Sequence, residues 1–169
     1  ESFAGPVHSY CRLETVDNGV LVADDGSLIS LLHLEGSLKH VGVEEYADIV
    51  SGLTEKLQAT LSKPGHALQV VFEYDPESSG ERIAELERYC ALEKCWLVLW
   101  TRPSVLPDTL RKTALKERDA AMSKMPTLVG CQQIARAVSA LHDAHNGFLT
   151  GVLDAFRQVD LLAFPLSAH

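Results

Sequence analysis

The sequence predicts an α/β fold of the α+β type, in which helices pack on a mixed, largely antiparallel sheet. Three patterns predict this class: two apolar runs joined by an Asp-Gly turn, a six-residue run that is apolar throughout, and long segments whose apolar residues recur at helical spacing. The expected order over the 169 residues is β-β-α-β-α-β-α-α-β, ending in a long helix and a final strand. We expect one domain, residues 1–169, because this length suits a single core.

The first two strands are predicted to form a hairpin. Residues 19–23 and 28–34 are apolar runs, and residues 24–27 (Asp-Asp-Gly-Ser) separate them. An Asp-Gly pair between apolar runs is a strong hairpin signal, because glycine adopts a positive φ without strain. We expect residues 35–36 (Glu-Gly) to end the second strand.

A helix over residues 43–61 and a strand over residues 66–74 are predicted next. Apolar residues three and four apart give the helix one buried stripe, made of Tyr46, Ile49, Val50, Leu53, Leu57 and Leu61. Pro64 and Gly65 break the helix. The strand alternates in polarity, and its predicted buried face carries Leu68, Val70, Phe72 and Tyr74. Residues 75–76 (Asp-Pro) are expected to end this strand.

The rest of the chain is predicted to be mainly helical, with two further strands. The expected elements are a short helix at 81–90, the central strand at 95–100, a charged helix at 107–122, a long helix at 131–159 and a last strand at 160–164. The long helix has a near-heptad apolar stripe of Ile134, Val138, Leu141, His145, Phe148, Val152, Phe156 and Val159. Pro165 is consistent with the end of a strand or an edge strand.

Charge and composition exclude several classes of protein. The net charge of −8 and a pI of about 5.3 leave no basic surplus for phosphate contacts, so direct nucleic-acid binding is not expected. No stretch approaches the roughly 20 apolar residues that span a bilayer. The four cysteines, Cys11, Cys90, Cys95 and Cys131, are isolated, which favours buried cytosolic thiols over a disulfide framework.

The sequence contains no recognisable catalytic motif. Neither a Gly-Lys pair nor G-x-G-x-x-G occurs, so we expect no ATP site and no cofactor in this chain. G-x-S-x-G is also absent. Ser27, Ser104, His66 and the pair at 24–25 (Asp-Asp) fit local structural roles in turns and at a strand start better than catalysis.

One set of residues is the only candidate metal site: Cys90, Cys95, His142 and His145. Their spacing matches neither C-x-x-C nor H-E-x-x-H, and His145 lies on the apolar stripe, so we predict no metal. Residues 147–151 form a G-x-x-x-G that suits close helix packing. Trp96 and Trp100 share one strand face, and we expect them to belong to the core, with a pocket for a partner at one end as the alternative.

Four segments together resemble a known family. They are residues 9–17 (Ser-Tyr-Cys-Arg-Leu-Glu-Thr-Val-Asp), residues 21–30 with Asp-Asp-Gly-Ser-Leu, residues 64–70 (Pro-Gly-His-Ala-Leu-Gln-Val) and residues 96–103 (Trp-Leu-Val-Leu-Trp-Thr-Arg-Pro). These segments are similar to the N-terminal region of the IcmB/DotO and TraU proteins. Those proteins are VirB-type traffic ATPases of type IVB secretion and conjugation systems.

The resemblance implies a non-catalytic N-terminal module that precedes a RecA-like motor, which binds ATP and Mg²⁺ and hexamerises. It implies a place in the cytoplasm, peripheral to the bacterial inner membrane. The implied partners are inner-membrane channel subunits, other secretion ATPases and further copies of the full-length protein. A start at Glu1 and an end just after an apolar stretch are what an excised domain would have. The segment between Tyr74 and Arg88 is shorter than the family's pattern, which leaves the local helix count open.

Two alternatives remain at this stage: a free-standing cytoplasmic adaptor without a motor, and a small metal-binding protein. Candidate contact residues for a partner lie on the cationic segment at 111–124 and on the long helix. They are Arg111, Lys112, Lys116, Arg118, Lys124, Phe148 and Phe156.

Overall fold

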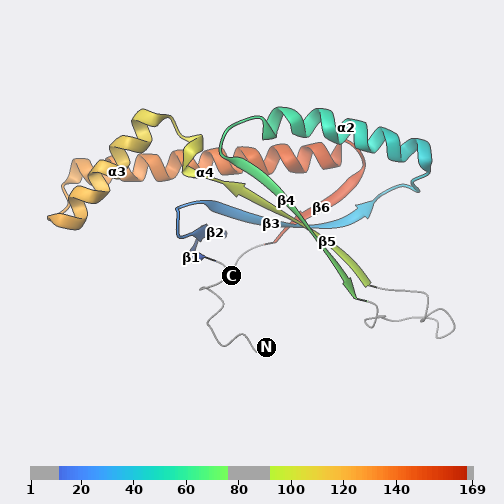
Figure 1. Ribbon diagram of the computed structural model, residues 1–169, viewed down its shortest axis with the longest axis horizontal. Helices are drawn as coiled ribbons and strands as arrows, with labels where there is room; N and C mark the ends of the chain where they lie inside the picture. The colour runs from blue at the N-terminus through green and yellow to red at the C-terminus, as the bar shows by residue number, and fades with distance from the viewer. Residues whose placement is uncertain (1–11, 76–91, 167–169) are drawn as a thin grey trace.

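The described part of the chain, residues 12–75 and 92–166 of a computed structural model, forms two layers (Figure 1). Its elements are β1 (Leu13–Asp17), β2 (Val20–Ala23), β3 (Leu28–Ser37), α2 (Val43–Leu61), β4 (His66–Asp75), β5 (Leu92–Thr101), the 3₁₀ turn η2 (Pro103–Val105), α3 (Asp108–Ser123), α4 (Leu128–Arg157) and β6 (Leu161–Pro165). One layer is the sheet; α2 and α4 run side by side over it, and α3 packs against α4. The predicted α+β class is confirmed.

The sheet is antiparallel at every pairing between its described strands. Its strand order is β1-β2-β3-β5-β4, and β6 also pairs with β3. Since β5 occupies one edge of β3, the strands β2 and β6 share the opposite edge, β2 near Ile29 and β6 from Leu32 onward. The apolar run at 95–100 lies in β5, between two neighbours, as predicted for a central strand.

The hairpin of β2 and β3 forms around the expected turn. Gly26 has a φ of +78°, and the Ser27 N–H donates to Asp25 Oδ1 at 2.9 Å. Two details differ from the prediction. The chain adds β1, whose mixed polar sequence gives no strand signal, and β3 continues through Gly36 to Ser37. Gly36, with a φ of +121°, lies in a β-bulge where the pairing with β6 shifts, so this glycine bends the strand instead of ending it.

Helix α2 has the predicted bounds, but only part of the predicted stripe is buried. Leu53, Leu57 and Leu61 pack against the main core, whereas Tyr46 is 63% exposed and Val50 is 45% exposed. The strands β4 and β5 run away from the first half of α2 (Figure 1).

Helix α4 begins three residues earlier than predicted. The Thr127 hydroxyl caps it by accepting a hydrogen bond from the Gly130 N–H at 3.1 Å, so Gly130 lies inside the first turn. The charged helix α3 and the last strand β6 are confirmed at nearly the predicted positions. The helix predicted at 81–90 lies outside the described residues.

Two apolar clusters hold the layers together. The larger joins the sheet to α4 through Leu32, Leu97, Leu99, Phe148, Val152 and Phe156. The smaller lies toward the start of α4 and consists of Val20, Leu28, Leu106, Ala137 and Leu141. Both clusters lie on the helix-facing side of the sheet, so the other side contributes little to this core.

Candidate functional site

A buried polar network lies between α4 and the sheet. His145 of α4 and Thr101 of β5 are both 0% exposed. His145 Nε2 lies 2.8 Å from the Ser30 hydroxyl on β3, and His145 Nδ1 lies 2.9 Å from the Thr101 hydroxyl. The Thr101 oxygen also lies 3.2 Å from His66 Nδ1 at the start of β4. One helix and three strands thus meet at four polar side chains.

The hydrogen-bond inventory of these groups is consistent with neutral histidines. A hydroxyl donates one hydrogen bond, and a neutral imidazole carries one N–H and one acceptor nitrogen. Thr101 can therefore donate to one of the two Nδ1 atoms and accept from the N–H of the other. Either direction also leaves His145 Nε2 correctly paired with Ser30. The network is satisfied without any charge.

Burial keeps these histidines neutral. Removal from water lowers the pKa of His145 from 6.5 to about 4, and the nearby rings of His142 and His66 act in the same direction. The pKa of His66 is also lowered, first by burial and then by Lys63. Because protonation would put a charge into the core, the network is stable near neutral pH.

The Ser30–His145 pair has the spacing of a nucleophile and its base, but it cannot act on a substrate as it stands. Ser30 is buried and points into the interface between sheet and helix, and His145 is buried on the side of α4 that faces the sheet. The exposed fraction is 9% for Ser30 and 0% for His145, which leaves a substrate little access to either group. The arrangement instead fixes the position of α4 on the sheet, which confirms the prediction that His145 is a packed histidine.

The two carboxylates of the hairpin turn, Asp24 and Asp25, stabilise local structure. Asp25 accepts the Ser27 N–H, and Asp24 pairs with Arg12 at 2.9 Å. Partial burial acts to raise the pKa of Asp25, but hydrogen bonds from Ser27 outweigh it and the pKa is lowered. A carboxylate held ionised in this way is a poor general acid.

The residues weighed as a metal site are not brought together. His142 bonds Asp17 at 3.0 Å, whereas His145 uses both ring nitrogens in the buried network. Cys95 lies six positions before Thr101 on β5, which corresponds to about 20 Å along a strand. Cys90 lies outside the described residues. Within residues 12–75 and 92–166, no group of three or more His, Cys, Asp or Glu side chains could hold a metal.

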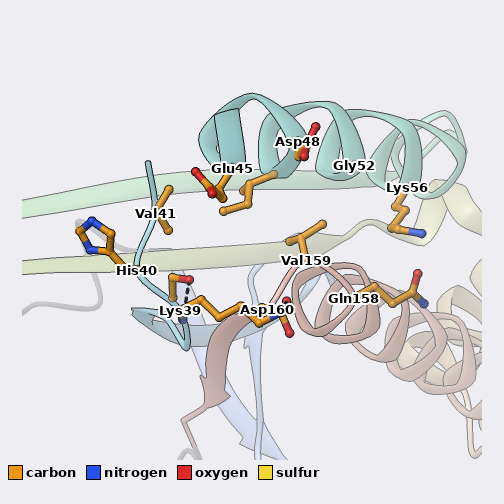
Figure 2. A pocket seen from close by; sticks show the side chains of 12 residues that line it. Lys39, His40, Val41, Glu45, Asp48, Gly52, Lys56, Gln158, Val159 and Asp160 are labelled. Carbon is orange, nitrogen blue, oxygen red and sulfur yellow. Dashed lines mark hydrogen bonds and ion pairs between the residues drawn. The ribbon is translucent and has the colours of Figure 1, made fainter. Parts of the chain in front are cut away.

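A polar cavity of about 400 Å³ lies where the loop after β3, the first half of α2 and the end of α4 meet (Figure 2). Lys39 Nζ and Asp160 Oδ2 pair across its floor at 2.6 Å. Glu45, on its rim, accepts the Gly42 N–H at 3.0 Å and so caps α2. Lys39 and Asp160 pair with each other, whereas Asp48 and Lys56 line the same cavity without belonging to this pair, and sequence analysis singled out none of these residues.

The predicted contact residues fall into two groups. Three of the five cations pair with acids of their own helix: Arg111 with Asp108 at 2.7 Å, Lys112 with Asp108 at 3.7 Å and Arg118 with Asp119 at 2.9 Å. Lys116 and Lys124 form no ion pair within the described part of the chain. Contact of this segment with a partner stays a prediction.

The prediction for the two phenylalanines is wrong. Phe148 is 2% exposed and Phe156 is 5% exposed, and both pack in the larger core cluster. They lie on the stripe of α4 that faces the sheet, so they present no surface to a partner. The sequence carried this signal, because both residues belong to the near-heptad stripe.

The face of the sheet away from the helices is apolar over much of β3 and β5, and no described helix packs on it (Figure 1). Alternation along β5 places Leu97 and Leu99 in the core and Trp96 and Trp100 on the opposite face. The open sheet face includes Leu31, His33, Val71, Trp96, Val98, Trp100 and Phe164, with the polar Gln69, Glu73 and Lys94 toward β4. Ile29, which pairs with Trp100 on the same face, is 3% exposed. The rings of His33 and Trp96 are 4.7 Å apart. Both tryptophans are only partly buried, which favours the partner-pocket alternative over the core.

A second apolar surface lies on the far end of β4 and β5. We define the distal ribbon as residues 70–75 of β4 with residues 92–95 of β5. Val70, Phe72 and Tyr74 point to the helix side of the sheet but are 61%, 60% and 59% exposed. Their predicted burial is wrong, because the ribbon runs away from the helix layer that would cover it (Figure 1).

Comparison with known proteins adds no assignment: no family model and no curated protein matches the chain. In the described parts, no helix is both long and apolar enough to cross a bilayer. The open sheet face and the distal ribbon are thus the features that bear most directly on function.

Proposed function

We propose that this chain is the docking and assembly domain of a type IV secretion or conjugation ATPase of the IcmB/DotO kind. In this role it performs no chemistry. It links the ATP-hydrolysing motor to inner-membrane channel subunits or to other secretion ATPases at the cytoplasmic side of the membrane. The four sequence segments that resemble this family motivate the proposal.

The open sheet face is the observation that supports docking best. Large aromatic side chains that stay partly in water are typical anchors of protein interfaces, because a partner can bury 150–250 Å² on each. Trp96 and Trp100 lie on this face on either side of Val98, and Leu31 pairs with Val98 while Val71 pairs with Trp96. A groove-filling or face-covering protein partner would bury these side chains together.

The remaining polar sites give catalysis less support than docking. The Ser30–His145 pair is buried, the turn carboxylates are engaged in the turn, and the cavity's main ion pair is internal. Contact with other proteins is the function that uses the exposed part of the molecule.

Co-purification with inner-membrane secretion subunits tests the proposal. The chain should retain at least one such subunit, and Val71→Glu with Phe164→Glu should reduce retention at least tenfold, since a charge on the open sheet face must be desolvated. Met122→Glu, an exposed apolar residue on α3, is the matched control and should leave retention unchanged. Retention by the full-length protein but not by the chain would count against the proposal, as would tight, saturable ATP binding by the chain.

A free-standing adaptor would use the same surface without a motor. The gene distinguishes the two, since a Walker A sequence downstream of His169 supports the ATPase domain and a stop codon supports the adaptor. Elemental analysis tests the metal-binding alternative, and stoichiometric zinc would reverse the ranking.

A further inference from the structure

Strand β4 ends the sheet, and its outer edge has no partner within residues 12–75 and 92–166. It pairs with β5 without interruption over ten residues, from His66 to Asp75. Exposed edges are usually protected by a lysine, a proline or a bulge, because unpaired N–H and C=O groups recruit other strands. The edge of β4 carries none of these devices, and its only acidic residues, Glu73 and Asp75, lie near one end.

The same strand exposes apolar side chains. Val70, Phe72 and Tyr74 are each more than half exposed on one face, and Val71 is 39% exposed on the other. Addition of one strand would pair the main-chain groups and bury these side chains in a single step. The edge therefore fits an extended, mainly apolar strand with little charge in its middle, which is also a description of β4 itself.

We propose that a second copy of this chain binds there, with its β4 antiparallel to the first and a two-fold axis at Val70. In this register Val70 lies opposite the second Val70, Leu68 opposite Phe72, and His66 opposite Tyr74. All three pairs lie on the helix-facing side, where cross-strand contacts between apolar and aromatic residues are favourable.

Charge selects the antiparallel arrangement. A parallel, in-register pair would place Glu73 opposite Glu73, and like charges directly opposite are destabilising. The antiparallel register places Glu73 opposite Ala67. The two Glu73 residues are then separated by six positions, about 20 Å, which exceeds the Debye length of about 8 Å at physiological salt. The strand is self-complementary in one direction only.

Two-fold symmetry also limits the assembly. Each copy uses its β4 edge once, so the pair closes and leaves no equivalent edge for a third copy. The proposed function includes oligomerisation, and self-pairing of β4 identifies the β4 edge as the surface for it. The β4 dimer needs no secretion subunit, so the dimer and the proposed docking function can fail separately. Only the purpose of the dimer, assembly of a secretion ATPase, rests on the proposed function.

Sedimentation of the chain from roughly 1 to 300 µM tests the dimer, because this range covers the weak affinities expected of small or transient interfaces. The native chain should pass from monomer to dimer over this range. Val70→Lys and Phe72→Lys should each weaken the dimer at least tenfold, and Met122→Lys should not. A monomer at every concentration, or a dimer insensitive to both β4 substitutions, would overturn the proposal.

Cysteine cross-linking tests the axis, in a chain whose four native cysteines are replaced by alanine. Val70→Cys should form an intermolecular disulfide efficiently, since directly opposite residues in an antiparallel pair have Cα atoms about 4.5–5.5 Å apart. Tyr74→Cys should not, because its opposite residue is His66. Cross-linking that is as efficient at 74 as at 70 would contradict this register, and an absence of cross-linking at both would contradict edge pairing.

Discussion

Strand β5 passes through two regions that share a sheet but differ in what lies on it. In the covered region, Leu99 and Thr101 are fully buried beneath α4. In the distal ribbon, Cys95 is half-buried and its neighbour on β4, Phe72, is largely in water. Alternation fixes the side to which each residue points in both regions. The position of the helices then decides whether that side becomes core or surface.

The polar side chains of the covered region are also more tightly packed than those of the distal ribbon. The covered region holds an uncharged, fully paired network around His145, which orders a helix on three strands. The ribbon holds one loose ion pair, Lys94 with Glu73 at 3.8 Å. One region is built for a single packing arrangement, and the other leaves its apolar surface open. Four predictions test this contrast, from the largest expected effect to the smallest.

Leu99→Ala should lower the free energy of unfolding by about 3–4 kcal/mol, since it leaves a cavity in the larger cluster. Phe72→Ala removes a bigger side chain, yet it should cost less than about 1 kcal/mol because that side chain is mostly hydrated in the free chain. Urea unfolding of the monomer at low concentration measures both. Equal costs would remove the distinction between the two regions.

His145→Ala should destabilise the chain by about 3 kcal/mol, because it leaves the buried hydroxyls of Ser30 and Thr101 without a partner. His142→Ala is the matched control on the same helix. It removes a partly exposed pair with Asp17 and should cost about 1 kcal/mol or less. The same unfolding measurement at pH 7.5 compares them, and a larger loss for His142→Ala would argue against the network.

Acid should destabilise the covered region. The native pKa of His145, about 4, is below the unfolded value of 6.5, so the unfolded chain binds more protons between these values. Stability is fully present above pH 6.5 and falls as the pH drops toward 4, by about 2 kcal/mol at pH 5. His66 adds to the loss in the same direction. A His145→Gln variant should lose correspondingly less between pH 7 and pH 5, and an unchanged slope would contradict this assignment.

Lys94→Ala should change the unfolding free energy by about 0.5 kcal/mol or less, because an exposed ion pair is weak. High salt should reduce even this difference, since screening acts on exposed charges. Unfolding at low and high ionic strength measures it. A cost above about 1 kcal/mol would mean that the ribbon is more tightly organised than its exposure indicates.

Local signals in the sequence predicted most of the elements. The Asp-Gly turn, the helical spacing over Val43–Leu61 and the apolar run at 95–100 each concern neighbours in sequence, and each was correct. Strand β1 was missed because its polar residues give no periodicity. Gly36 was predicted to end the strand, because glycine occurs both at strand ends and in β-bulges.

Contacts between distant segments could not be predicted in the same way. Ser30 and His145 are 115 residues apart, and no spacing rule connects a hydroxyl on one strand to an imidazole on a later helix. The exposure of Val70 and Phe72 depends on where α2 leaves the strand, which the alternation of β4 does not encode. The wrong assignment of Phe148 to a contact surface came from a different cause, since its place on the apolar stripe already indicated burial.

The shared edge of β3 has a consequence for synthesis on the ribosome. Its first half meets β2 almost at once, but its second half waits for β6, whose Ala163 pairs with Leu34 about 130 residues later. At elongation rates of about 5–20 residues per second, the second half of this edge is without its partner strand for roughly 6–26 seconds. We expect nascent chains halted before β6 to bind chaperones that recognise extended apolar segments, and chains released after β6 to escape them.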